Sequence, residues 1–298
     1  RSSAASDVYK RQVQQATIAS LQIASSNTYR VRGTGSLQLD STDGMASMEV
    51  TSGDHRIDAD LELVDDATIN IATGASLSLG GTTNLQDRTV TKEGAGTLYL
   101  DGTTQLAGST LNIVAGADGG EGEIVVDLQI DSGALAPGRK DTGSSVCDFS
   151  RSCNQMEVLG NFELGANGTL AVEIGGDLTS HYDHLSVQGT AELNGSIEIA
   201  LTDGYQVEAG RQFMVLSADE VIHNNVSLTG PAADFFTLHF NPKSAILQAV
   251  VPVYQWSLAT GGDWHTDGNW SWSGFPDGLL TVESVSYTHL TLPTSDLV

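Results

Sequence analysis

The sequence predicts an all-β protein built as a parallel β-solenoid (β-helix), followed by a further β-rich segment. Across residues 13–135 short segments alternate apolar and polar side chains, turn-forming residues separate them, and helical periodicity is absent. Aromatic residues make up only 6% of the chain, and small residues suit a narrow interior. An antiparallel β-sandwich is the alternative architecture.

Matching apolar pairs recur at steps of eight residues, which gives the spacing between successive strands. They lie in residues 61–63, 69–71 and 77–79, with Asp65, Asp66, Thr73 and Gly74 in the gaps. Three strands per coil at this step give a repeat inside the window of roughly 20–50 residues that is typical of stacked architectures. We therefore expect solenoid repeats over residues 13–138.

The rest of the chain divides by composition. Residues 139–155 form a polar insertion, and residues 156–252 form a second β-rich segment with longer alternating strands. This segment either continues the coil or folds as a sandwich, and its bulkier aromatics favour a capping or flanking role. Residues 253–284 are expected to begin a further module.

Both ends of the chain look like sequencing adaptors. Residues 7–12 can be encoded as GAT GTG TAT AAG AGA CAG, and the reverse complement encodes Val285 to His289 and the start of Leu290. Inverted copies of one DNA element resemble transposon-end adaptors. We therefore exclude residues 1–12 and 285–298 from fold reasoning and expect an internal fragment.

Charge and composition exclude several classes of protein. Lys and Arg number 13 against 37 Asp and Glu, a net charge of −24, which repels nucleic acid and anionic lipid. No apolar run approaches the roughly 20 residues that span a bilayer. We expect neither nucleic-acid binding nor membrane insertion by this fragment.

Three motifs carry a resemblance to a known family. Residues 91–102 read TKEGAGTLYLDG, residues 132–138 read SGALAPG, and residues 182–195 read YDHLSVQGTAELNG. The first resembles the autotransporter-associated β-strand repeat, K-x-G-x-G-T-L-x-L-x-G. The others are similar to segments that follow such repeats in bacterial surface proteins, in the same order.

The resemblance implies an extracellular, passenger-type β-solenoid of a bacterial surface protein. In the first motif the Gly-x-Gly pair would form a tight corner, and Leu98 and Leu100 of the following strand would point inward. The implied location is secreted or cell-surface, associated with the outer membrane. The implied partners are extracellular or cell-surface glycans or proteins.

All four tryptophans lie together near the C-terminal end, at Trp256, Trp264, Trp270 and Trp272. Their spacing resembles the segment that opens a further module in multi-domain bacterial surface proteins. A Trp-rich cap for the next solenoid is the favoured interpretation. A glycan-binding site is the alternative, because an exposed indole can stack on a sugar ring.

Residues that could support catalysis or metal binding have structural interpretations that we favour. Asp65 and Asp66 could be the paired carboxylates of a glycosidase, but they lie in a repeat-spaced turn. His181, Asp183 and His184 could bind zinc, yet Asp183 and His184 fall inside the third motif. No Gly-x-Ser-x-Gly nucleophile turn occurs in the sequence.

The Gly-rich segment of residues 118–123 carries three carboxylates of the kind that calcium takes as ligands. It lacks the repeated period of calcium-binding nonapeptides. We expect no cofactor, no metal site and no catalytic residue, with calcium at this segment as the alternative.

Both cysteines, Cys147 and Cys153, lie in the polar insertion, and we expect them to form an intramolecular disulfide in an oxidising compartment. The expected function is a non-catalytic structural or adhesive scaffold. The alternatives are a polysaccharide-degrading β-helix enzyme, because fold alone does not decide function, and a carbohydrate-binding module centred on the tryptophans.

Overall fold

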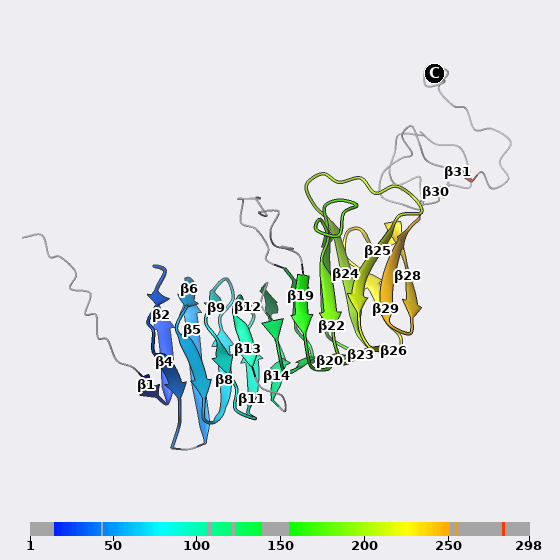
Figure 1. Cartoon of the computed structure of the whole chain (residues 1–298). Coiled ribbons are helices and arrows are strands. Elements are labelled where there is room, and N and C mark those ends of the chain that lie inside the picture. Colours follow the sequence, from blue (N-terminus) through cyan, green and yellow to red (C-terminus); the bar gives the residue numbers. More distant parts are fainter. Residues whose placement is uncertain are drawn as a thin grey trace, which may run out of the picture.

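The computed structural model describes residues 15–42, 44–105, 109–120, 123–138 and 155–250. It also places two short paired strands, β30 (Tyr254–Gln255) and β31 (Val282–Glu283). Within these residues the chain is nearly all strand, with one short 3₁₀ helix, η1 (Ala233–Phe235). Figure 1 shows the strands stacked side by side along one axis, which confirms the predicted all-β parallel solenoid.

Three sheets run the length of the solenoid, and each coil contributes one strand to each of them. Sheet A contains, in order, β1 (Gln15–Ile18), β4 (Ser36–Leu39), β7 (Asp60–Leu63), β10 (Thr83–Asn84), β13 (Thr103–Gln105), β16 (Glu123–Ile124), β19 (Gln155–Val158), β22 (His184–Val187), β25 (Gln212–Ser217), β29 (Ser244–Ala249) and β28 (Phe236–Asn241). Sheet B contains β2 (Ser20–Ala24), β5 (Met45–Ser52), β8 (Asp66–Ile71), β11 (Thr89–Glu93), β14 (Thr110–Ile113), β17 (Asp127–Ile130), β20 (Phe162–Leu164), β23 (Thr190–Leu193) and β26 (Glu220–His223). Sheet C contains β3 (Arg30–Val31), β6 (Asp54–Ile57), β9 (Ser76–Leu79), β12 (Thr97–Leu100), β15 (Ala117–Gly120), β18 (Ala134–Pro137), β21 (Thr169–Ile174), β24 (Ser196–Leu201) and β27 (Ser227–Thr229).

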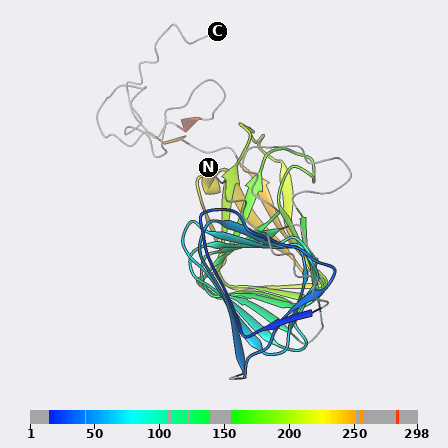
Figure 2. The same ribbon diagram turned by 90° about the vertical axis from the view of Figure 1, so that its left-hand side faces the viewer.

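The eight-residue step found in the sequence corresponds to the spacing between successive strands within one coil. Strands β7, β8 and β9 contain the three apolar pairs, one pair in each sheet. Neighbouring coils pair in parallel register, for example Leu98 with Leu77 and Val90 with Ala67. Seen along the axis in Figure 2, the three sheets form three walls around one interior.

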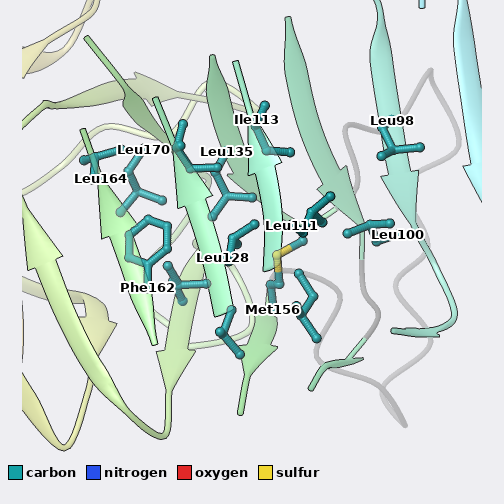
Figure 3. Packing of buried hydrophobic residues seen from close by; sticks show 14 of the residues in the cluster. Leu98, Leu100, Leu111, Ile113, Leu128, Leu135, Met156, Phe162, Leu164 and Leu170 are labelled. Carbon is teal, nitrogen blue, oxygen red and sulfur yellow. The ribbon is translucent and has the colours of Figure 1, made fainter. Parts of the chain in front are cut away.

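Side chains that point inward stack in columns from coil to coil. In sheet B the register places one such column across six strands: Ala67, Val90, Leu111, Leu128, Phe162 and Ala191. All are buried, and Figure 3 shows several of them packed with Leu98 and Leu135 of sheet C. Because a fully buried Leu or Phe stabilises a fold by roughly 1.5–3 kcal/mol, this continuous column is a main source of stability.

The second β-rich segment continues the solenoid. Strands β19, β20 and β21 pair in parallel with β16, β17 and β18, so the sheets run past the insertion after Gly138 without a break. Two further coils follow, giving nine coils in the described part of the chain. Of the two alternatives left open by the sequence, the structure therefore shows the continuing coil.

An antiparallel hairpin closes the C-terminal end of the coils. Strand β29 pairs antiparallel with β25 and with β28. Beneath it, the ring of Phe213 makes edge-to-face contacts with Tyr182 at 5.2 Å, Phe236 at 5.9 Å and Tyr205 at 6.5 Å between centroids. The larger rings fill an end where a tenth coil would otherwise stack, so within the described part of residues 156–252 only the terminal hairpin caps the coils and the strands before it continue them.

Candidate functional site

Asp65 and Asp66 lie at the corner between β7 and β8, and each binds the backbone of a different neighbouring coil. The N–H of Ser41, in the preceding coil, donates to Oδ2 of Asp65 at 2.7 Å. The N–H of Thr89, in the following coil, donates to Oδ1 of Asp66 at 2.9 Å. The two carboxylates thus satisfy backbone donors at a turn, which is the structural role favoured for this pair.

The same corner repeats this bond further along the rod. Oδ1 of Asp127 accepts the N–H of Asn161 at 2.7 Å, and Oδ1 of Asn161 accepts the N–H of Thr190 at 3.0 Å. A short polar side chain at this position accepts a backbone N–H of the following coil. These bonds link successive coils at the corner before sheet B.

The segment with His181, Asp183 and His184 lies in an excursion between β21 and β22. Its base is closed by an antiparallel bridge between Ile174 and Tyr182, and the N–H of Gly175 donates to the carbonyl of His181 at 2.8 Å. Tyr182 is buried and packs on Phe213. The tyrosine therefore anchors the excursion to the core.

Asp183 is buried and bonds with the backbone of Glu173 in both directions. Its Oδ2 accepts the N–H of Glu173 at 2.9 Å, and its own N–H donates to the Glu173 carbonyl at 3.0 Å. Burial raises the pKa of Asp183 to about 8; the bond from the Glu173 N–H opposes this shift and the negative charge of Glu173 adds to it.

The two histidines do not join Asp183 in a ligand set. His181 is exposed, whereas His184 is half-buried, its Nε2 has no hydrogen-bond partner, and burial lowers its pKa. Among the described residues no group of three His, Cys, Asp or Glu side chains is placed to hold a metal ion.

The lysine of the first motif has a role that the sequence analysis missed. Lys92 is fully buried, and its Nζ donates to the carbonyl oxygens of Gly94 (2.7 Å), Gly96 (2.6 Å) and Ala115 (2.9 Å). Gly116 makes room for it, because a Cβ there would lie 2.4 Å from Nζ. In the K-x-G-x-G pattern the lysine thus buries its ammonium group, which donates to the carbonyls of the two glycines of the motif and to one carbonyl of the next coil.

The expected features of the Gly-x-Gly corner are present. Gly94 has φ +74°, and a Cβ on it would lie 2.3 Å from the Ile71 carbonyl oxygen of the preceding coil. Leu98 and Leu100 point inward and are buried. Alternation offered a signal for Lys92, since Val90 and Lys92 occupy the same face of β11, but lysine is rarely found inside a protein.

A second feature missed from the sequence is a group of arginines on the outer face of sheet C. Arg30, Arg32 and Arg56 all contact one carboxylate, that of Asp58. The register that pairs Arg30 with Arg56 brings them together across two coils. Their separation in the sequence gives no sign of this, because coil lengths vary.

Several predicted features lie wholly or partly outside the described residues. The Cys147–Cys153 pair and the four tryptophans, Trp256, Trp264, Trp270 and Trp272, are outside them. In the Gly-rich acidic segment only the side chain of Glu123 is described among the three carboxylates, and it is half-buried. The disulfide, the glycan contact and calcium binding therefore stay predictions.

Comparison of the chain with protein-family models and with curated proteins gave no match. In the part of the chain that the structure describes, no helix has the length and apolar character needed to cross a bilayer.

Proposed function

We propose that this chain is a secreted or cell-surface bacterial scaffold, structural or adhesive, without catalytic activity. The observation that carries the proposal is the unbroken stacking of nine coils in three sheets. At the usual strand spacing of about 4.8 Å this stack extends for roughly 40 Å. Such a rod gives reach and a regular surface.

The motifs support the surface assignment. The lysine and glycines of the first motif form the corner described above, and the tyrosine and aspartate of the third anchor the excursion before β22. Motifs that serve the coil geometry in this way are consistent with the autotransporter-associated passenger class that they resemble.

The outer surface also fits a scaffold. The carboxylates of Asp65 and Asp66 accept backbone N–H groups from neighbouring coils, so they contribute to the stacking of the coils. The net charge of −24 favours solubility and repels anionic surfaces at low salt, and divalent cations would relieve this repulsion.

Small-angle scattering and a polysaccharide panel together test the proposal. Scattering from residues 13–284 should show an anisotropic particle, and acidic and neutral polysaccharides should show no turnover. Depolymerisation that persists after rigorous purification and disappears in Asp65→Asn/Asp66→Asn would overturn the scaffold in favour of a β-helix enzyme.

A third outcome concerns the tryptophan segment. Binding of a polysaccharide without turnover, lost in Trp264→Ala or Trp270→Ala, would assign the carbohydrate-binding role to that segment and leave the solenoid as its support. If both variants still bind the polysaccharide, the binding surface lies on the coils instead.

A further inference from the structure

The outer face of sheet C carries three arginines close together on a strongly acidic chain. We call Arg30, Arg32, Arg56 and Asp58 the arginine cluster. Oδ2 of Asp58 accepts from Nε of Arg30 and lies 3.5 Å from Nε of Arg32, while Oδ1 accepts from Nε of Arg56 at 2.5 Å. Three guanidinium groups thus share the carboxylate of Asp58.

Arg56 is held in place from a third and a fourth coil. Its Nη1 donates to Oγ of Ser78 at 2.7 Å and also to a carboxylate oxygen of Asp101. Gly80 lies under the guanidinium, and a Cβ there would be 2.4 Å from Nη2. Even with Asp101 counted, the three arginines outnumber the carboxylates that they contact.

Arg30 and Arg32 present the accessible part of the cluster. Their side chains are 46% and 64% exposed, and each is tied to Asp58 through Nε. A guanidinium carries five N–H donors in a planar fork, and the terminal pair matches the two oxygens of a carboxylate or sulfate. Anchoring through Nε leaves that terminal pair directed away from Asp58.

The column that contains Arg30 and Arg56 also contains an aromatic ring. The register aligns Arg56 with Ser78 and Ser78 with Tyr99, so all three side chains lie on the outer face of sheet C. Tyr99 is half-buried. An aromatic ring on the same outer face as the guanidinium groups, two strands from Arg56, is a suitable surface for another sugar ring of a ligand held by its acidic group.

We propose that the arginine cluster binds the carboxylate or sulfate group of an acidic glycan, whose sugar rings extend toward Tyr99. A nucleic acid is a poorer fit, because its dense row of phosphates would meet the acidic surface around this small patch. The inference rests on the adhesive part of the proposed function and gives it a ligand class. The scattering test is independent of it, so either can fail alone.

Isothermal titration calorimetry at physiological ionic strength, where repulsion by the net charge of −24 is screened, tests the proposal with tetragalacturonate, its methyl ester and a sulfated galactan oligosaccharide. The full chain should bind at least one acidic ligand and not the uncharged ester. Arg30→Gln/Arg32→Gln should weaken that binding by about tenfold or more, because bidentate charge-assisted bonds are lost. Whether uronate or sulfate binds identifies the source of the acidic group.

Two variants serve as controls. Arg88→Gln, a single neutralisation of an exposed arginine in the turn before β11, should leave the affinity within about twofold. Gly80→Ala retains every charge but displaces Arg56, so it should weaken binding although the net charge is unchanged. Far-UV circular dichroism checks that each variant is folded.

Three results would overturn the inference. They are the absence of binding to both acidic glycans, an equal loss of affinity in Arg88→Gln and in the double variant, and equal affinity for a single-stranded oligonucleotide of the same charge. Any of them would leave the arginine cluster as a structural ion-pair network.

Discussion

The first six coils and the last three bury ionisable groups by different means. In the fourth coil Lys92 is buried with its ammonium on three carbonyl oxygens. In the excursion before the eighth coil Asp183 is buried, and its carboxylate accepts one backbone N–H and lies near the negative charge of Glu173. Fixed carbonyl dipoles can stabilise a buried cation, whereas Asp183 lacks equivalent compensation and is driven toward its neutral form.

The largest effect is expected for Lys92→Met. This variant keeps the aliphatic volume but leaves the carbonyls of Gly94, Gly96 and Ala115 without their donor, at a cost of about 3 kcal/mol or more in the free energy of unfolding. Urea unfolding measures it. Lys243→Met, at an exposed ion pair with Asp219, should cost less than about 1 kcal/mol. Equal midpoints for the two variants would contradict the role of Lys92.

Two glycines with the same backbone angle separate strain from steric overlap at the motif corner. Gly94 (φ +74°) faces the Ile71 carbonyl, whereas Gly74 (φ +75°) has no atom within 4 Å of an added Cβ. Gly74→Ala should cost about 1 kcal/mol, the usual penalty of a left-handed residue, and Gly94→Ala at least about 2 kcal/mol more. Similar losses in thermal unfolding would show that the coils do not approach closely at Gly94.

The pH dependence of stability tests the burial of Asp183. Its pKa is about 8 in the folded protein against about 3.8 in the unfolded chain, so the folded state binds more protons between these values. This contribution is complete below about pH 3.8 and is lost as pH rises toward 8, and the free energy of unfolding should therefore fall across that window by on the order of a few kcal/mol.

Asp183→Asn should remove this decline and stabilise the protein at pH 8, because the amide oxygen can still accept the Glu173 N–H without a buried charge. Glu163→Gln, at an exposed carboxylate on β20, should leave the decline in place. In Asp183→Asn the opposite trend of His184 should become visible. Burial lowers its pKa, so its contribution is lost as pH falls below about 6.5. An unchanged profile in Asp183→Asn would contradict the assignment.

A smaller effect is expected at the corner before sheet B. Asp66→Ala removes the acceptor for the Thr89 N–H, which is near the surface and can bond to water, so the loss should be about 1 kcal/mol. Asp66→Asn keeps an acceptor and should retain most of the stability. Equal losses in the free energy of unfolding for the two variants, measured with urea, would contradict this assignment.

Much of the fold could be predicted from the sequence, because apolar pairs at a constant step report strands directly. The pairs in residues 61–79 mark one complete coil. The continuation past residue 155 could not be decided, because the later coils are longer and their strands match either a coil or a sandwich. Turn lengths, which vary freely at the surface, hide the repeat there.

The candidate sites were less predictable, since they depend on contacts between coils. Asp65 and Asp66 were assigned to a turn from their spacing, but the partners in the preceding and following coils require the register. The arginine cluster depends on the alignment of Arg30 with Arg56. A shift of one residue would place one of these side chains inside the solenoid.

Disulfide cross-linking across the insertion tests most directly that one solenoid runs through both regions. With Cys147 and Cys153 replaced by Ser, Gln129→Cys/Glu163→Cys places two thiols at registered positions of β17 and β20, where adjacent parallel strands are about 4.8 Å apart. Gln129→Cys/Glu192→Cys is the matched control, because β23 lies one strand further, about 10 Å away. Peptide mapping by mass spectrometry should find an intramolecular disulfide in the first variant and none in the second. A disulfide in the control, or none in the registered pair under oxidising conditions, would contradict the continuous solenoid.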